Sequence, residues 1–314
     1  MKILYSVRNS FSAVEQLKLF KDLNKDFTCK VMGFYDSIHQ LEVVDWVLDG
    51  LYLNASPKES KYLADKFKYK LPKVNSYLFQ KLLEDVKQYG PNLIISDLEP
   101  VSAFVAKILN IPYWKVSSLH IIDYAILPKN VLNKKIFNNI NYHLRSLPKS
   151  DRTLIISPFA DFYEFEINSN AEWICPYFYK DGQIYDDNFI IINQSRNKLQ
   201  QGLIDYELDV YDNSENLNFQ NCDWILTDGL VSNISKALYA GLCNIYCTYD
   251  VMDLETYINS ALIQFLDLGK CFPDWNRTPE KIPDYIYNLQ KFKIMKQSSF
   301  ESKYFNLGEI IKNI

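Results

Sequence analysis

A strand, a glycine turn and a helix follow one another between residues 223 and 241, and this order constrains the fold more than any other part of the sequence. The run from Asp223 to Leu226 is apolar enough for a buried strand, Gly229 allows a tight turn, and Gly241 ends the helix that follows. Such a turn directs the amide groups at the start of the helix toward one point, where an anion binds without a charged side chain. The sequence therefore predicts an α/β unit with an anion site after this strand.

Short apolar runs alternate with helical patterns along the whole chain. Strands are predicted at residues 2–7, 28–34, 91–97, 111–117, 153–157, 189–193, 205–210, 223–226 and 243–247, with another short one within 43–53. Apolar residues at helical spacing predict helices at 13–23, 101–109, 195–203 and 300–314, and one or two more within 58–89, interrupted at Pro72. This alternation favours parallel sheets with helices on both faces.

The strand and helix pattern restarts near residue 170, which predicts two domains. We expect an α/β fold of two doubly wound Rossmann-like domains that face a cleft at the carboxyl ends of their strands. Residues 1–168 form the first domain, residues 169–297 form the second, and residues 298–314 form a terminal helix that crosses back to the first.

Composition narrows the class of protein. No apolar run reaches the roughly 18 residues of a membrane span, and the short apolar start reads as a strand rather than a signal peptide. Six cysteines without CxxC spacing favour reduced thiols in a cytoplasmic protein, which is the host cytoplasm if a phage encodes it. With three histidines, a histidine-based metal site is not expected.

Residues 229–259 resemble the donor half of nucleotide-sugar glycosyltransferases with the GT-B architecture. That family has a Gly-rich turn, Glu-Ala-Leu, a closing Gly and, about a dozen residues later, Asp or Glu followed by Gln-x-x-Asn-Ala. The residues that match in register are Gly229, Ala237, Leu238, Gly241, Glu255 and Asn259. The chain departs from the pattern at Asp228, Leu230, Lys236, Cys243 and Thr256.

The resemblance implies a donor site in the second domain. Helix amides and small hydroxyls there hold the diphosphate, and the acidic residue of the second motif holds ribose or sugar hydroxyls. The donor-binding candidates are Ser195, Arg196, Asp228, Gly229, Ser232, Asn233, Glu255 and Asn259. Helix capping is the alternative role of Ser232 and Asn233, and Glu255 also suits the first turn of a helix as an acidic residue.

The first domain carries a motif of its own. Residues 92–100 and 106–112 resemble the Asp-Leu-Val-Ile-Ser-Asp-x-Glu-Pro and Ala-Lys-x-Leu-x-Ile-Pro pattern of one glycosyltransferase branch. An inverting transferase needs a base that takes the proton of the acceptor hydroxyl, and burial raises the pKa of a carboxylate toward working pH. Asp97 and Glu99 are the candidates for this base. Each could instead cap the helix that follows.

The glycine- and histidine-containing turn that related enzymes have after their first strand is absent here. The chain has Arg8-Asn9-Ser10 at this place, so the family's histidine base is missing and Asp97 becomes the favoured base. Asn9 and Ser10 are candidates for the acceptor side of the cleft. His120 follows a predicted strand and is a third catalytic candidate, although a lone histidine is more often structural.

Charge is divided unevenly between the two halves. Residues 1–168 carry 22 Lys and Arg against 18 Asp and Glu, whereas residues 169–314 carry 12 against 20. A basic acceptor domain is compatible with an anionic acceptor, such as a modified DNA base or a phosphate-containing polymer. Phage enzymes that glycosylate hydroxymethylated DNA bases also use the GT-B architecture, and duplex DNA would require base flipping. Solvated helix faces are the simpler explanation of the basic residues.

The resemblance predicts a glycosyltransferase that moves a hexose or pentose from a nucleoside-diphosphate sugar, by first choice a UDP-sugar, to an acceptor hydroxyl. The transfer is expected to invert the sugar and to need no metal or other cofactor, because helix amides stabilise the leaving diphosphate. Two alternatives share the fold: a nucleotide-sugar epimerase or hydrolase, and a protein that binds nucleotides without catalysis. The sequence leaves the acceptor and the oligomeric state open.

Overall fold

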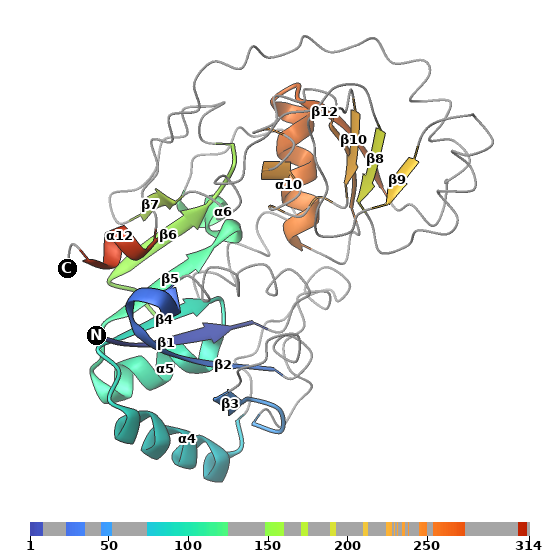
Figure 1. Cartoon of the computed structure of the whole chain (residues 1–314). Helices are drawn as coiled ribbons and strands as arrows, with labels where there is room; N and C mark the ends of the chain where they lie inside the picture. The colour runs from blue at the N-terminus through green and yellow to red at the C-terminus, as the bar shows by residue number, and fades with distance from the viewer. Residues whose placement is uncertain are drawn as a thin grey trace. The chain divides into compact units, whose positions relative to one another are not determined.

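A computed structural model of the chain describes residues 1–8, 23–34, 45–51, 74–124, 148–159, 171–174, 189–192, 210–212, 224–227, 229, 231, 234–235, 238, 245–249, 254–273 and 307–312. The chain divides into two compact units (Figure 1). Unit 1 comprises Met1–Ser157, Phe165–Cys175 and Tyr304–Ile314, and unit 2 comprises Pro158–Glu164 and Pro176–Lys303.

Unit 1 contains a sheet of seven strands, in which every pairing is parallel. In chain order the strands are β1 (Lys2–Val7), β2 (Thr28–Gly33), β3 (Trp46–Val47), β4 (Leu93–Asp97), β5 (Tyr113–Ser117), β6 (Arg152–Ile156) and β7 (Ala171–Ile174). Across the sheet they lie in the order β3-β2-β1-β4-β5-β6-β7. The chain therefore moves outward in one direction from β1 and in the other direction from β4, as in doubly wound folds.

Unit 2 contains a second parallel sheet, of five strands. These are β8 (Phe189–Ile192), β9 (Val210–Asp212), β10 (Trp224–Thr227), β11 (Ile245–Tyr249) and β12 (Gly269–Pro273). Their order is β12-β11-β10-β8-β9, so the direction of winding changes between β8 and β10. Both sheets thus have the doubly wound arrangement that the sequence predicts.

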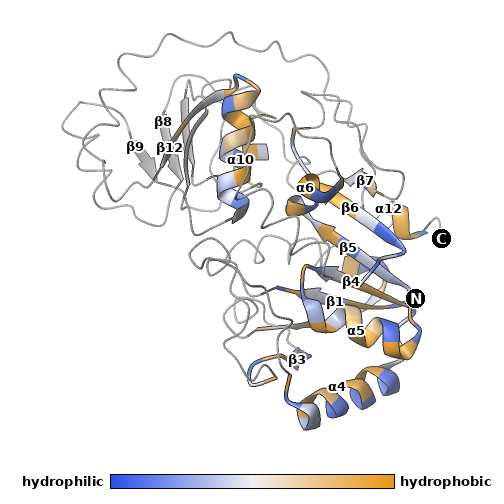
Figure 2. Ribbon diagram, turned by 180° about the vertical axis from the view of Figure 1, so that it is seen from behind, coloured by the Kyte–Doolittle hydropathy of each residue, from blue (hydrophilic) through white to orange (hydrophobic). Residues whose placement is uncertain are grey.

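Helices connect and cover these strands. They are α4 (Ser76–Tyr89), α5 (Pro100–Leu109), the 3-10 turn η1 (Ser118–His120), α6 (Ile121–Tyr124), α10 (Leu254–Phe265) and α12 (Leu307–Lys312). The ends of α4 are set by its sequence: the Asn75 side chain accepts bonds from the amides of Tyr77 and Leu78, and Gly90 ends the helix with a φ of 63°. Figure 2 shows bands of both hydrophilic and hydrophobic residues along α4, as expected of a helix with one buried face.

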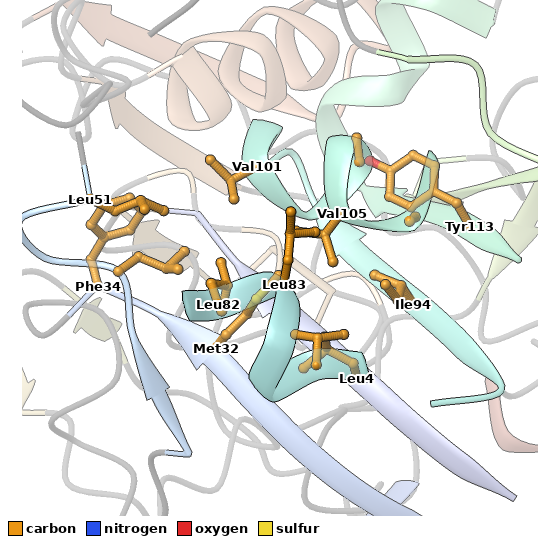
Figure 3. Packing of buried hydrophobic residues seen from close by; sticks show 14 residues of the cluster. Leu4, Met32, Phe34, Leu51, Leu82, Leu83, Ile94, Val101, Val105 and Tyr113 are labelled. Atoms are coloured by element: carbon orange, nitrogen blue, oxygen red, sulfur yellow. The ribbon is translucent and has the colours of Figure 1, made fainter. Parts of the chain in front are cut away.

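The core of unit 1 lies on both faces of its sheet. Leu4 of β1 and Ile94 of β4 are paired in register and pack with residues of α4 and α5 such as Leu83 and Val105 (Figure 3). Their neighbours along the strands point to the opposite face, and Ile3, Tyr5 and Ile95 are also fully buried. A sheet buried on both faces explains why these strands read as continuous apolar runs rather than as alternating ones.

The terminal helix belongs to unit 1. Leu307, Ile310 and Ile311 of α12 are buried, and the Lys312 ammonium lies 2.7 Å from the Asp26 carboxylate, which precedes β2. The predicted domain limits, at residues 168 and 297, stay predictions. Strand β7 begins at Ala171, after the first of these limits, and it pairs with β6 in the sheet of unit 1.

Two strands of unit 2 differ from the sequence-based expectation. The pattern predicts a strand at 205–210, and the structure places β9 at Val210–Asp212. The pattern misses β12, whose sequence Gly-Lys-Cys-Phe-Pro contains residues that are uncommon in strands. Among the described strands β12 lies at the edge of its sheet, where glycine and proline are better tolerated than in a central strand.

Leu82→Ala tests the packing of α4 against the sheet. Leu82 is 7% exposed in the cluster that α4 and α5 form with the sheet, so we expect a loss of about 2–5 kcal/mol in the free energy of unfolding. Tyr77→Ala on the same helix is the control, because Tyr77 is 75% exposed and should change stability by less than about 0.5 kcal/mol. Urea unfolding measures both, and equal losses would contradict the packing described here.

Candidate functional site

The carboxyl ends of β1 and β4 form the point in unit 1 where the winding changes direction. Ligands of doubly wound folds bind outside the carboxyl ends of the strands at such a point. Val7, the last residue of β1, is in register with Asp97, the last residue of β4. The structure therefore brings Asp97 beside the residue that follows β1, which is Arg8.

Asp97 and Arg8 form a buried ion pair. The Arg8 Nε atom lies 3.3 Å from Asp97 Oδ2, and the two side chains are 7% and 0% exposed. Tyr5 lies two residues before Val7 on the same strand, and therefore on the same face of the sheet as Val7 and Asp97. Burial is the main cause that raises the pKa of the Tyr5 hydroxyl well above its ordinary value, and the negative charge of Asp97 raises it further. The sequence gives no signal for a role of Arg8, because it does not show which residues are placed side by side by strands that are distant in the chain.

Glu99 is occupied as the N-cap of α5. Its Oε1 accepts a bond from the amide of Val101 at 3.0 Å, and its Oε2 accepts one from the amide of Ser102 at 2.7 Å. The Ser6 hydroxyl donates to Oε2 at 3.3 Å. A carboxylate in this position satisfies free amides and suits the positive end of the helix dipole. The geometry thus gives Glu99 the capping role that the sequence offers as its alternative.

The turn between these two carboxylates has an unusual backbone. Leu98 has a φ of 54°, in the left-handed region that few residues other than glycine adopt. Such a conformation costs on the order of 1–3 kcal/mol and occurs often at functional sites. It sends Asp97 and Glu99 in different directions, so that Asp97 pairs with Arg8 while Glu99 bonds the start of α5.

His120 lies at the end of η1 and is completely buried. Burial, followed by the positive charges of Lys115 and Arg8, lowers its pKa well below the ordinary value. The imidazole is therefore neutral at neutral pH. Lys115 of β5 is itself 3% exposed, and burial lowers its pKa against the opposing effect of Asp123. Arg8, Lys115, His120 and Asp123 thus form one group of electrostatically coupled side chains, which the sequence does not reveal.

In unit 2, the described donor-site candidates cluster around Gly229. This residue follows β10, next to the change of winding between β8 and β10, and has a φ of 82°. Asn259 of α10 donates from Nδ2 to the Gly229 carbonyl oxygen at 3.0 Å. Glu255 lies one turn earlier on α10 and is 3% exposed. Gly229, Glu255 and Asn259 are thus in one place, as expected if the two motifs build one site.

The remaining candidates fall on residues that the structure does not describe. These are Asn9, Ser10, Ser195, Arg196, Asp228, Ser232 and Asn233. Val231, Ile234, Ser235 and Leu238 are helical and buried, so a helix begins within two residues of Gly229. The Ser235 hydroxyl donates to the Val231 carbonyl at 2.5 Å inside this helix.

The described residues bear on metal binding and on membrane insertion. They contain no group of three or more His, Cys, Asp or Glu side chains that could hold a metal ion, and a metal-independent reaction stays a prediction. In the same part of the chain, no helix is both long and apolar enough to span a membrane.

A family model gives the first comparison with known proteins. The model of glycosyl transferase family 1 matches residues 1–172, which is more than half of the 314 residues. No curated protein matches the sequence.

Solved structures similar to this one span almost the whole chain. The SsfS6 glycosyltransferase of Streptomyces sp. SF2575 has a TM-score of 0.56 at 11% identity, covering 92% of this chain and 91% of its own. The glycosyltransferase VinC in complex with dTDP has a TM-score of 0.52 at 11% identity, covering 91% and 90%. UGT89C1 of Arabidopsis thaliana, complexed with UDP-L-rhamnose, has a TM-score of 0.54 at 13% identity, covering 87% and 85%. At these identities the likeness concerns the fold, and it confirms the predicted GT-B fold class.

Arg8 and Asp97 should depend strongly on each other. Asp97→Asn or Arg8→Met removes one member of this ion pair and leaves the other charge buried, and we expect each to lower the free energy of unfolding by about 3–5 kcal/mol. The double variant should lose less than the sum of the two, as urea unfolding of a double-mutant cycle would measure. Additive losses would argue against a direct interaction.

His120 should make unfolding sensitive to pH. Because its folded pKa lies below the unfolded value of about 6.5, the unfolded chain takes up the proton first. Stability from this group is therefore complete above pH 6.5 and falls as the pH drops below it, by at most about 1.4 kcal/mol per pH unit. Urea unfolding from pH 7.5 to 5.5 should show a smaller slope for His120→Gln than for the wild type. Identical slopes would contradict a neutral, buried His120.

Proposed function

The chain belongs to glycosyl transferase family 1 and is a glycosyltransferase, and from this premise we propose that it moves a sugar from a nucleoside-diphosphate sugar to an acceptor hydroxyl with inversion and without an essential metal. The observation that carries the proposal is the position of Asp97, at the carboxyl end of β4 and at the change of winding in unit 1. This is the place where doubly wound folds bind their ligands.

Asp97 is the proposed general base. Among the three catalytic candidates, Glu99 is already bonded to the amides of α5 and the Ser6 hydroxyl, and His120 lies on η1 beyond the end of β5, whereas Asp97 ends β4 at the change of winding. Arg8 offsets the cost of burying the Asp97 charge. Asp97 would accept the proton of the acceptor hydroxyl while that oxygen attacks the anomeric carbon and the nucleoside diphosphate leaves.

The donor is proposed to bind at the Gly229 turn of unit 2. The start of a helix beside this turn suits a diphosphate, because free amides and the helix dipole both favour an anion. Two of the similar structures are complexes with dTDP and with UDP-L-rhamnose, which supports a nucleoside-diphosphate sugar here. A UDP-sugar is our first choice, and helix amides would stabilise the leaving diphosphate in place of a metal.

The acceptor is proposed to be anionic, because residues 1–168 carry a net positive charge whereas the chain as a whole is acidic. A modified base in DNA or a phosphate-containing polymer fits this description. We also propose that the enzyme acts in the cytoplasm, where both a nucleotide sugar and such polymers are present.

The first experiment is a thermal-shift and turnover screen with UDP-, GDP-, ADP- and dTDP-sugars, followed by DNA that carries hydroxymethylpyrimidines. Stabilisation by one donor, and its consumption only when acceptor is present, would support the proposal and identify both substrates. An isomerised sugar without acceptor would indicate an epimerase, and free sugar would indicate a hydrolase. If no nucleotide stabilises the protein, the proposed donor site is wrong and a non-catalytic role is favoured.

Asp97→Asn should remove the base while leaving the donor site intact. We expect turnover to fall by about 10²–10⁴-fold, with the Kd for the nucleoside diphosphate unchanged, because the Gly229 turn is in the other unit. Titration calorimetry gives this Kd, and urea unfolding shows that the variant is folded under the assay conditions. Glu84→Gln, an exposed carboxylate on α4, is the matched control and should keep full turnover. Full turnover of Asp97→Asn would exclude Asp97 as the base.

A further inference from the structure

We propose that Asn259 is a positioning residue, which fixes the Gly229 turn by a hydrogen bond to its carbonyl and thereby holds the donor site in its binding geometry. This assignment rests on the proposed donor site, and it changes the role of Asn259. The sequence offers this residue as a contact to the donor, but its side-chain amide is engaged with the protein backbone.

The Gly229 turn packs tightly against α10. A Cβ atom built on Gly229 would lie 2.9 Å from the Thr256 carbonyl oxygen and 3.0 Å from Ser260 Oγ. Both distances are shorter than ordinary contacts of side-chain carbon atoms, and the positive φ of Gly229 independently disfavours any other residue. The turn therefore lies directly on the first two turns of α10.

The hydrogen bond between Asn259 and the Gly229 carbonyl is buried. Asn259 is 4% exposed, and its Nδ2 lies 3.0 Å from the Gly229 oxygen, 30 residues earlier in the chain. Without Asn259 this buried carbonyl would lose the Nδ2 donor at 3.0 Å, and the loss of a buried hydrogen bond is costly. The bond thus selects one orientation of the Gly229 peptide.

Asn259 and Glu255 lie one turn apart on α10. Residues four apart on a helix lie on the same face, so Glu255 is next to Asn259 on the side of α10 that contacts the turn. In the proposed function the turn holds the diphosphate and Glu255 holds hydroxyl groups. Asn259 therefore keeps the two parts of the donor site at a fixed separation, without a contact to the donor of its own.

The aspartate variant offers a test that separates positioning from simple stability. Asn259→Asp keeps the shape but places a carboxylate oxygen against the Gly229 carbonyl oxygen, whereas its protonated form can donate a hydrogen bond again. Burial favours that protonated form. Binding by Asn259→Asp should therefore recover as the pH falls, and binding by Asn259→Ala should not.

The experiment is titration calorimetry with UDP and with dTDP at pH 8.0 and pH 5.5, together with melting temperatures. For the nucleotide that the wild type binds, we expect both variants to have a Kd about tenfold higher at pH 8.0. At pH 5.5 only Asn259→Asp should return toward the wild-type value. Each variant is compared with the wild type at the same pH, so that effects of pH that all the proteins share cancel. Gln264→Ala, an exposed position on α10, is the control and should bind as the wild type does.

Two results would overturn the assignment, and they are distinguishable. If the variants melt at a lower temperature but bind nucleotide with unchanged Kd at a temperature where they are folded, Asn259 only stabilises the unit, and the proposed function is unaffected. If the wild type binds neither UDP nor dTDP, the proposed donor site fails before any variant is made, and the role of Asn259 fails with it.

Discussion

The parallel pairing of β1 with β4 is the constraint on which the first unit depends. It places Leu4 beside Ile94 in the core under α4 and α5, and three residues further along it places Val7 beside Asp97. The same register that builds the core thus brings Arg8 to Asp97 and creates a buried ion pair at the carboxyl edge of the sheet. A slip of one residue would turn Asp97 toward the other face and separate this pair.

The two units use a similar local device at the point where the winding of each sheet changes. In each, a residue with positive φ follows the strand, at Leu98 after β4 and at Gly229 after β10, and a helix begins within two residues. A buried side chain then fixes each turn. Glu99 does so from within the turn by capping α5, and Asn259 does so from α10. Turns held in this way would suit the proposed reaction, in which proton transfer and diphosphate departure need fixed geometry.

The alternation of apolar strands and helices was enough to predict two parallel, doubly wound sheets, because strands buried on both faces leave a strong pattern. The alternation did not predict β12, because Gly269 and Pro273 are residue types that are uncommon in strands. The structure brings Gly229 of the first donor motif into contact with Asn259 of the second, and the donor-binding role of these residues stays a prediction. The sequence could not predict what the Asn259 side chain contacts. The same local sequence is compatible with an asparagine that binds a ligand and with one that bonds a backbone carbonyl.

The sequence by itself determined the fold class, the family resemblance and the position of the candidate carboxylates after a buried strand, because periodicity and short motifs are properties of neighbouring residues. Only the tertiary structure decided that Asp97 pairs with Arg8 while Glu99 caps a helix. The reason is the φ of 54° at Leu98, which redirects the chain between them. Two residues that an extended strand would place on one face are thereby given different partners. The backbone conformation at Leu98 and the register of β1 against β4 both depend on contacts between residues some 90 positions apart in the chain, and no local pattern encodes them.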